Sequence, residues 1–310
     1  MQKVRWAGID EAGYGPNLGP LVMTAVVAEA PEGTVVDVWN DLSNTVGRAG
    51  TPSNRLAIDD SKLIYKAGVG RSALDAGVLA LLNAIGRPMP STFGELLQAL
   101  ETGSLEEAEL TPWIDSDPLW KAPPLPCLDP FAQVPWRLVD VRAVVVGPAR
   151  FNAGLNATGS KATVHFQAFR GLLDRLWRDT TVDCSTKVVG DKHGGRHYYL
   201  DLLVDAFPDA WIDRGPEGPE LSRYVIRQGG RRLELSLRPK ADSGDGLVAL
   251  ASMVAKSVRE HWMDAFNTYW ARRIPHLKAT AGYPQDALRF RREIEAASTV
   301  PDPDLWWRRK

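Results

Sequence analysis

The chain has 310 residues, of which 44% are hydrophobic and 24% are charged. This length and composition are sufficient for the core of one large domain or two small ones. Lysine and arginine total 37 against 38 aspartate and glutamate, which excludes a strongly basic protein that holds nucleic acid by overall charge. A polyanionic ligand would therefore need local basic patches or bound metal ions.

Cysteine usage and the N-terminus indicate the compartment. Cys127 and Cys184 form no CxxC pair, so neither a disulfide framework nor a zinc site is expected, and both are interpreted as packing residues. The first ten residues lack the apolar stretch of a signal peptide, and the chain has no run of about 18 apolar residues. We expect a soluble, cytoplasmic protein.

Hydrophobic patterns in the first half predict strands around a glycine-rich turn. Val4 to Asp10 and Leu21 to Val27 have the pattern of two adjacent strands. A helix is expected near 72–84, and a third strand over 141–146, bounded by glycine and proline.

Residues 87–137 differ from their surroundings, because they are rich in proline and contain Trp113, Trp120 and Trp136. This composition predicts an extended, irregular insertion rather than a separate domain. We therefore expect a single domain over 1–310, in which most tryptophans pack in the core.

The second half alternates helices with strands. Apolar residues at helical spacing over 166–177 predict a helix, which leads into a strand over 186–190 that ends at Asp191. A hairpin is expected around Gly229 and Gly230, followed by a long helix over 247–258. This interleaving is typical of the α/β class.

Acidic residues next to small residues suggest a metal-dependent reaction on phosphodiesters. Such hydrolysis needs an activated water and neutralisation of developing charge, which two divalent ions roughly 4 Å apart supply. These hard cations prefer several carboxylates from separate parts of the chain. Asp10 and Glu11, Asp191, and Asp242 meet this description.

Each acid also has a structural interpretation when taken alone. Asp10 or Asp191 can form a turn, Asp242 can cap a helix, and Glu11 can be a solvated surface acid. Neighbouring strand residues point to opposite faces, so Asp10 and Glu11 serve one site only if the chain twists there. The joint pattern of the four acids is what favours a site.

The segment from Gly8 to Pro16, followed by Gly19-Pro20, resembles the opening signature of ribonucleases HII and HIII. Four further segments resemble motifs of this type 2 ribonuclease H family, in the same order. They are Asp60-Ser61-Lys62-Leu63, Asp191 at a strand end, Lys240-Ala241-Asp242 with the helix segment Ala251 to Lys256, and Gly282-Tyr283-Pro284.

The resemblance implies roles for individual residues. The four acids Asp10, Glu11, Asp191 and Asp242 would hold two Mg²⁺ or Mn²⁺ ions. Lys62 would contact a phosphate, and Tyr283 would pack on a sugar near the scissile bond. The backbone at Gly13 and Gly15 would lie against the RNA strand, where 2′-hydroxyls distinguish RNA from DNA.

Some features depart from one branch of the family or the other. The segments 151–165 and 198–199 resemble ribonuclease HIII more than HII, but the chain begins directly at the catalytic strand, without the extra N-terminal domain typical of HIII. Tyr14 stands where ribonuclease HII has an arginine that helps to recognise a single embedded ribonucleotide. Tyrosine stacks but supplies no charged fork to phosphate, so Tyr14 favours longer hybrids as substrates.

We therefore expect a ribonuclease H-like fold, with a central mixed sheet flanked by helices and a helical C-terminal part. The expected activity is cleavage of the RNA strand of RNA/DNA hybrids by a monomer, leaving a 3′-hydroxyl and a 5′-phosphate. Two alternatives stay open. One is a nuclease of the same fold for another nucleic-acid structure, and the other is a binding relative without catalysis.

Weaker signals have simpler interpretations. The glycines from Gly13 to Gly19 miss the dinucleotide-binding spacing, and Gly154 to Lys161 reverses the lysine and serine order of a phosphate loop. His193 and His197 are interpreted as a polar surface pair, although His193 is also a candidate for proton transfer or product release. The tryptophan-rich insertion and the tail 306–310 are candidates for nucleic-acid binding, and the tail is the better candidate of the two, because its two tryptophans precede three cations.

Overall fold

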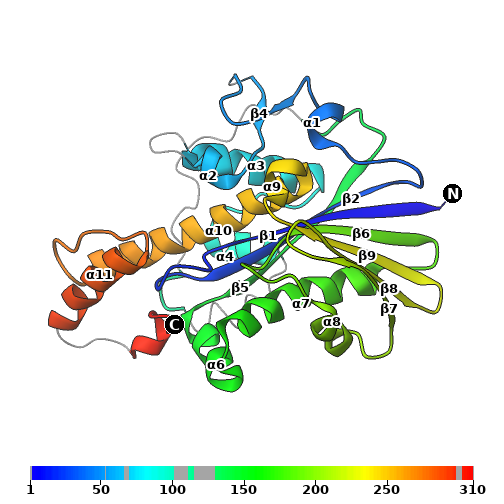
Figure 1. The fold of residues 1–310 in the computed structure, drawn as a ribbon. Coiled ribbons are helices and arrows are strands. Elements are labelled where there is room, and N and C mark those ends of the chain that lie inside the picture. The colour runs from blue at the N-terminus through cyan, green and yellow to red at the C-terminus, as the bar shows by residue number, and fades with distance from the viewer. Residues whose placement is uncertain are drawn as a thin grey trace.

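A seven-stranded sheet forms the centre of the computed structural model, which describes residues 2–52, 54–65, 70–100, 111–114, 130–297 and 302–309. The strand order is β5-β2-β1-β6-β9-β8-β7 (Figure 1). The strands are β1 (Lys3–Ala12), β2 (Leu21–Pro31), β5 (Arg137–Val146), β6 (Cys184–Asp191), β7 (Trp211–Glu217), β8 (Ser222–Gln228) and β9 (Arg231–Arg238). A separate pair consists of β3 (Val46–Gly47) and β4 (Leu56–Ala57).

Strand directions make the sheet mixed. β2 is antiparallel to both β1 and β5, whereas β1, β6 and β9 are mutually parallel neighbours. β8 and β7 then continue antiparallel from β9. The expected α/β class, with a central mixed sheet between helices, is confirmed.

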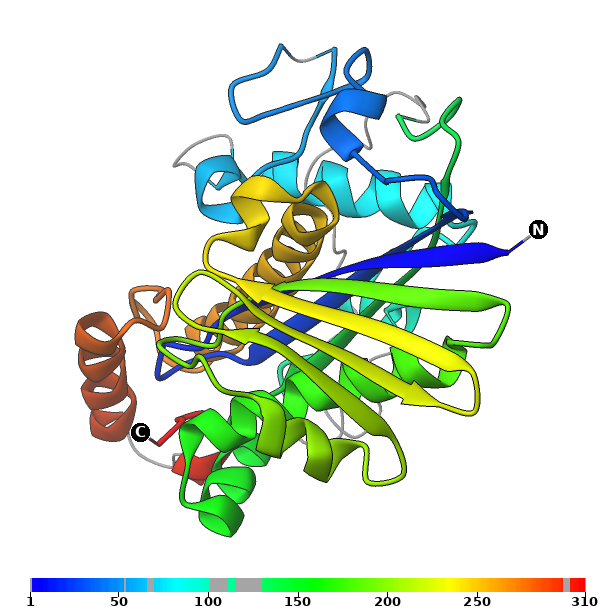
Figure 2. The same ribbon diagram turned by 45° about the vertical axis from the view of Figure 1, so that its right-hand side comes forward.

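Helices cover both faces of the sheet, as Figures 1 and 2 show. The helices are α1 (Val38–Asp41), α2 (Ser61–Ile64), α3 (Gly70–Ala84), α4 (Phe93–Ala99), α6 (Pro148–Thr158), α7 (Lys161–Asp179), α8 (Leu200–Ala206), α9 (Ala241–Gly244), α10 (Gly246–Ala271), α11 (Pro284–Ala296) and the 3₁₀ helix η1 (Pro303–Leu305). α10 crosses one face together with α3, and α7 covers the other with α6 and α8.

Alternation along β2 divides the core into two layers. Val22 and Val26 are buried toward α10, whereas Met23 and Ala25 are buried toward α7. A strand between two helical layers is apolar on both faces, which explains the nearly continuous apolar sequence of β2.

α10 lies unusually close to the centre of the sheet. A Cβ added at Gly8 of β1 would lie 2.2 Å from the backbone carbon of Leu247, so only glycine permits this approach. Asp245 caps α10 by accepting hydrogen bonds from the backbone N–H groups of Leu247 and Val248. The helix start is thereby fixed against β1.

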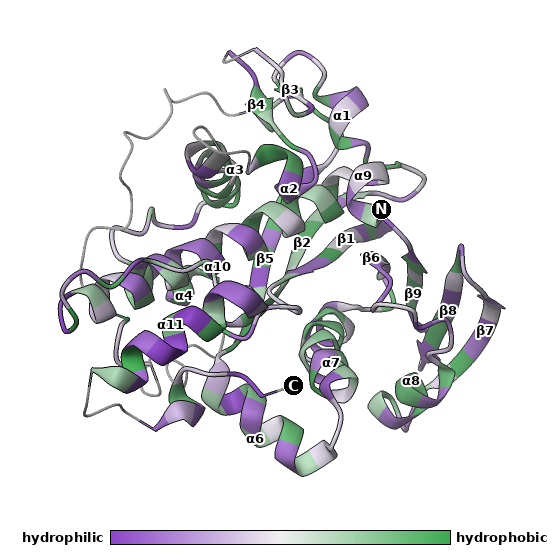
Figure 3. Ribbon diagram, turned by 60° about the vertical axis from the view of Figure 1, so that its left-hand side comes forward, coloured by the Kyte–Doolittle hydropathy of each residue, from purple (hydrophilic) through white to green (hydrophobic). Residues whose placement is uncertain are grey.

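The C-terminal part is helical, as expected. Figure 3 shows α11 as a mostly hydrophilic helix, and its buried residues are Ala287, Phe290 and Ile294. No helix in the described ranges is long and apolar enough to cross a membrane.

The proline-rich insertion is less irregular than the composition predicts. Residues 93–99 form α4, capped by Thr92, and Trp113 and Trp136 are buried. Trp113 packs edge-on against Trp262 of α10, so the prediction of packing tryptophans is confirmed for these two. Trp120 and Cys127 lie outside the described residues, and Cys184 is a partly exposed free thiol.

Candidate active site

Three neighbouring parallel strands end at the same edge of the sheet, and an acid follows or closes each of them. Ile9 of β1 is paired with Gly190 of β6. The next residue on each strand is an aspartate, so Asp10 and Asp191 lie side by side. β6 pairs with β9 as far as Asp191, and α9, which follows β9, carries Asp242. The register therefore brings three aspartates to the carboxyl edge of β1, β6 and β9.

Asp10 faces the helix α10. Side chains alternate along a strand, so Asp10 shares the face of Gly8, whose Cβ position points at Leu247. The Ser252 hydroxyl of α10 also interacts with the Asp10 carboxyl. Because β1 and β6 are parallel and in register, Asp191 lies on the same face.

Glu11 reaches the edge from the opposite face. It shares the side of Ile9, which is buried in the core layer beneath α7, and its Oε1 lies 3.6 Å from Nε2 of His165 on α7. β1 pairs with β2 through its last residue, so Asp10 and Glu11 keep the alternation of the strand and reach the sheet edge from opposite faces. Their charges still influence each other there, because Glu11 raises the pKa of Asp10 in addition to the effect of burial.

Burial and mutual repulsion raise the pKa of the aspartates. Desolvation raises the pKa of Asp10 well above its usual range, and the nearby charges of Glu11 and Asp242 add to this. Burial also raises the pKa of Asp191, with a contribution from Glu11. Burial raises the pKa of Asp242, as do Asp60 and Asp191. Acids held together in this way are a feature of functional sites.

These acids fit divalent cations in the chemistry of their donors. Within the described ranges, no three His, Cys, Asp or Glu side chains are gathered closely enough to hold an ion. Carboxylates that repel one another are expected to stay apart until a cation compensates their charge, and oxygen donors from separate elements are what Mg²⁺ and Mn²⁺ prefer. Asp10, Glu11, Asp191 and Asp242 are the residues that would hold them.

The short helix α2 places Lys62 beside this edge. Asp60 caps the helix by accepting a hydrogen bond of 2.8 Å from the Lys62 N–H. Ser61 contacts Ser252 of α10 through their hydroxyls at 3.0 Å. The charge of Lys62 partly offsets the rise that burial causes in the pKa of both Asp191 and Asp242. Asp60 is an additional acid at the site that the sequence analysis quoted in its motif without assigning it a role.

The glycine loop after β1 presents backbone on one side and a tyrosine on the other. Gly13 has φ of +85°, and a Cβ there would lie 2.2 Å from the Pro20 carbonyl oxygen, whereas Gly15 has open space around it. The Tyr14 ring contacts His165 edge-on at 4.7 Å, and Nζ of Lys161 lies 4.6 Å from its centre. Lys161 is a cation near this loop that the sequence analysis missed.

Tyr283 is exposed next to the glycine loop. Its side chain is 54% exposed, so it is accessible to a ligand. The preceding Gly282 has φ of +83° and accepts hydrogen bonds through its carbonyl from the N–H groups of Asn17 and Leu18. This glycine therefore ties Tyr283 to the loop that begins at Gly13.

His193 and His197 do not form the predicted surface pair. The His193 ring lies 4.5 Å from the rings of both His165 and Phe169, whereas the His197 ring lies beside Tyr198. Burial lowers the pKa of His193 well below its usual value, so this imidazole is neutral near pH 7. The prediction of two solvated histidines was wrong because α7 covers the first.

The C-terminal tail is also not the exposed platform that its composition predicts. Trp306 is fully buried and packs against Trp270 of α10. Arg308 is 2% exposed, and Lys310 lies outside the described residues. Trp306 and Arg308 therefore fill the interior, whereas Arg309 is exposed.

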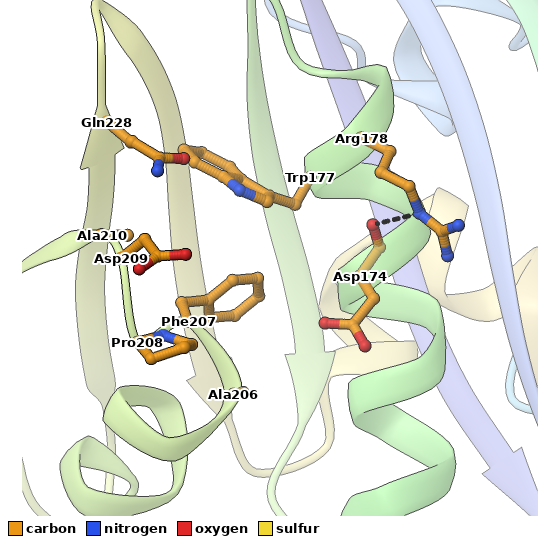
Figure 4. A pocket seen from close by; sticks show the side chains of 9 residues that line it. All are labelled: Asp174, Trp177, Arg178, Ala206, Phe207, Pro208, Asp209, Ala210 and Gln228. Atoms are coloured by element: carbon orange, nitrogen blue, oxygen red, sulfur yellow. Dashed lines mark hydrogen bonds between the residues drawn. The ribbon is translucent and has the colours of Figure 1, made fainter.

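A hollow of 310 Å³ lies at the other end of the sheet (Figure 4). Its lining comes from the end of α7, including Trp177 and Arg178, the segment 206–210, and Gln228 at the end of β8. The adjoining strand β9 begins at Arg231 and only reaches the acidic edge at its far end. The hollow is therefore separate from the acids.

Comparisons with known proteins agree with the motifs. No protein-family model matches the chain. The ribonuclease HII of Thermofilum pendens is 28% identical over 229 residues, covering 71% of this chain and 94% of that protein. The solved structure of the PCNA and ribonuclease HII complex from Archaeoglobus fulgidus matches at 14% identity with a TM-score of 0.48, covering 99% of this chain and 94% of that one.

A second solved structure, ribonuclease H2 from Pyrococcus horikoshii, matches at 15% identity with a TM-score of 0.44 and covers 91% of this chain and 82% of that one. The similarity to the Thermofilum ribonuclease HII extends over most of the chain, and the five motif segments agree with it. The chain is therefore a divergent relative of the type 2 ribonucleases H.

Proposed function

We propose that the protein is an endonuclease that hydrolyses the RNA strand of RNA/DNA hybrids, with Asp10, Glu11, Asp191 and Asp242 as ligands of two divalent ions. The observation that carries this proposal is the edge at which three parallel strands deliver buried, mutually repelling carboxylates. The relationship to ribonuclease HII supports the choice of substrate.

Bound Mg²⁺ or Mn²⁺ would supply an activated water and neutralise charge on the phosphoryl and leaving oxygens. Asp10, Asp191 and Asp242 hold their carboxylates on the α10 face, and Glu11 holds its own from the α7 face. Cleavage at this site leaves a 3′-hydroxyl and a 5′-phosphate.

Residues around the acids position the hybrid. Lys62, fixed by the cap at Asp60, is close enough to influence two of the acids and neutralises a phosphate next to the scissile one. Gly15 leaves space for the RNA backbone, because nothing lies within 4 Å of its Cβ position. The exposed ring of Tyr283 packs against a sugar beside the loop.

Tyr14 favours stretches of hybrid over a single embedded ribonucleotide as the substrate. Its ring lies against His165 and near the Lys161 ammonium, and Tyr14 itself lacks a charge that recognises an isolated ribonucleotide in DNA. Stretches of hybrid are therefore the proposed substrate. A monomeric state and a cytoplasmic location stay predictions.

The decisive experiment compares labelled RNA/DNA hybrid, a duplex with one embedded ribonucleotide, duplex DNA and duplex RNA, with Mg²⁺, Mn²⁺ or a chelator. We expect hybrid cleavage that needs the metal and falls by about 100-fold to 1,000-fold in Asp191→Asn, since charge stabilisation in the transition state is lost. Asp205→Asn, an exposed acid on α8, is the matched control and should cleave normally.

Three outcomes would contradict the proposal in different ways. Activity that survives both chelation and Asp191→Asn rules out the metal mechanism. Cleavage of duplex DNA alone identifies a nuclease of the same fold with another substrate. Tight binding of hybrid by the wild type without metal-dependent cleavage identifies a binding relative that has lost catalysis.

A further inference from the structure

The C-terminal tail is joined to the glycine loop by hydrogen bonds in both directions. Nη2 of Arg308 donates to the Gly13 carbonyl oxygen at 2.6 Å and also to the Pro16 carbonyl oxygen. The Arg308 backbone N–H donates to the Asn17 carbonyl at 2.8 Å, and the Asn17 side chain donates back to the Arg308 carbonyl at 3.2 Å. One residue of the tail therefore contacts both ends of the loop.

The tail is itself anchored to the body of the protein. Asn152 of α6 donates to the Trp307 carbonyl at 2.8 Å and accepts from the Arg309 N–H at 2.9 Å. The Arg308 guanidinium lies over the Phe151 ring at 4.8 Å, and Figure 1 shows the C-terminal end beside α6. The loop is thus connected through Arg308 to a helix of the opposite half of the chain.

Burying this guanidinium is costly. In the described part of the chain no carboxylate pairs with Arg308, and its Nε and Nη1 have no hydrogen-bond partner. The like charge of Arg259, which is also buried under the loop, opposes it further. An unpaired buried charge costs several kcal/mol, so an apolar residue would pack the tail more favourably. An apolar residue could not, however, donate the hydrogen bonds that Arg308 makes to the carbonyls of Gly13 and Pro16.

We infer that Arg308 is a positioning residue, which holds the glycine loop in the conformation that receives the RNA strand and contributes to binding only through that loop. The inference rests on the proposed function of the loop. It also differs from the nucleic-acid contact that the composition of the tail suggests, because the hydrogen bonds of Arg308 are directed toward the protein interior and not toward solvent.

The test compares two neutralising changes in adjacent residues. Arg308→Gln removes the buried charge, and Arg309→Gln removes a charge that is 42% exposed and pairs with Asp304. Both variants lose one positive charge from the same tail. A tail that binds phosphates directly depends more on Arg309, whereas a tail that positions the loop depends on Arg308.

Binding is measured by fluorescence anisotropy of a labelled hybrid in the Asp191→Asn background, and turnover is measured in the otherwise native enzyme. We expect Arg308→Gln to weaken hybrid affinity about 10-fold, the value of one or two charge-assisted hydrogen bonds. Turnover at saturating hybrid should stay within about two-fold, because the metal ligands are untouched. Arg309→Gln should change affinity by less than about two-fold, as an exposed ion pair contributes little.

Hydrogen exchange in the free protein, without metal or nucleic acid, tests the positioning independently of the activity. The amide hydrogens of residues 13–18, apart from Pro16, should exchange faster in Arg308→Gln than in the wild type. In Arg309→Gln their exchange rates should equal those of the wild type. If the wild type neither binds nor cuts hybrid while the exchange result holds, the proposed function fails and the structural part of the inference stands.

Two results overturn the inference. One is unchanged hybrid affinity in Arg308→Gln, and the other is an equal or larger loss in Arg309→Gln. Should Arg308→Gln not fold, Arg308→Lys decides instead. It keeps the charge but not the planar fork, so it should lose affinity about three-fold with one of the carbonyl bonds, and unchanged affinity again overturns the inference.

Discussion

The two faces of the sheet differ sharply at the edge where β1, β6 and β9 end. On the α10 face, burial raises the pKa values of Asp10, Asp191 and Asp242, and neighbouring acids add to this rise. On the α7 face, Glu11 stands beside His165, whose ring is enclosed by Tyr14 and His193. One face concentrates negative charge, and the other surrounds a single carboxylate with rings.

The difference shows how one strand serves two purposes. Because side chains alternate along β1, two successive acids reach the edge from opposite layers of the core. The acids on the α10 face come from three elements, and Lys62 offsets the charge of Asp191 and Asp242 only in part, because the pKa of both stays raised. Such carboxylates are expected as ligands of a cation. Glu11 instead lies 3.6 Å from Nε2 of His165, a buried nitrogen without a hydrogen-bond partner in the described structure. This imidazole is placed to support the carboxylate as a metal ligand.

The largest expected effect separates a site acid from a structural acid in the same turn. Asp242→Asn should lower hybrid cleavage by about 100-fold to 1,000-fold, because a carboxylate of the α10 face is lost. Asp245→Ala, the control, removes the cap of α10 and should lower the free energy of unfolding by about 1 kcal/mol while turnover is maintained. Steady-state kinetics and thermal unfolding measure both.

Equal loss of turnover in the two variants would mean that the acids around α9 act by holding the helix start. The acids of the α10 face would then contribute to the stability of the fold and not to catalysis.

A smaller effect is expected from the α7 face. His165→Leu removes the imidazole 3.6 Å from Glu11, so the carboxylate loses its partner. Mn²⁺ affinity, measured by calorimetry without nucleic acid, should fall about 10-fold, as is typical when the partner of a metal ligand is removed. His197→Asn, in the neighbouring loop, should leave it unchanged.

His165→Gln provides a second variant, since its amide still reaches toward Glu11 and should retain most of the Mn²⁺ affinity. If both His165 variants bind Mn²⁺ like the wild type, the two faces act independently and Glu11 needs no support from α7.

Much of the fold is predictable from the sequence because the central elements are strongly patterned. β1, β2 and the start of α10 agree with the predicted segments, since each is an apolar run that follows glycines or a polar turn. α10 continues to Ala271, well beyond the predicted segment 247–258. β7 was missed, because it is an edge strand with mostly exposed side chains and contains Gly215 and Pro216. α6 was missed as well, because few of its residues are buried.

The candidate site is predictable only in part. Local motifs indicated the acids, and strand register places Asp10 next to Asp191. The surroundings of those acids depend on contacts between distant segments, which composition does not reveal. Arg308 is the clearest example. The composition of the tail does not show whether this arginine faces solvent or, as in the structure, donates hydrogen bonds to the carbonyls of Gly13 and Pro16.

The smallest expected effect concerns the stability of the metal-free protein. Burial and neighbouring acids raise the pKa of Asp10, so the folded state holds a proton that the unfolded state releases above about pH 3.9. Where the folded state binds more protons, the free energy of unfolding falls as pH rises. The wild type in chelator should therefore lose stability as pH rises from about 4 through the raised pKa of Asp10.

Asp10→Asn removes this charge, so it should be more stable than the wild type at neutral pH although it is inactive. Each kcal/mol of relieved repulsion corresponds to a rise of about 2–4 °C in Tm for a chain of this size, and the difference between the two proteins should shrink toward about pH 4. Mn²⁺ should raise the Tm of the wild type and have much less effect on the variant. A variant that is less stable than the wild type in chelator at neutral pH would show that Asp10 is held by favourable contacts, and the contrast between the two faces would lose its physical basis.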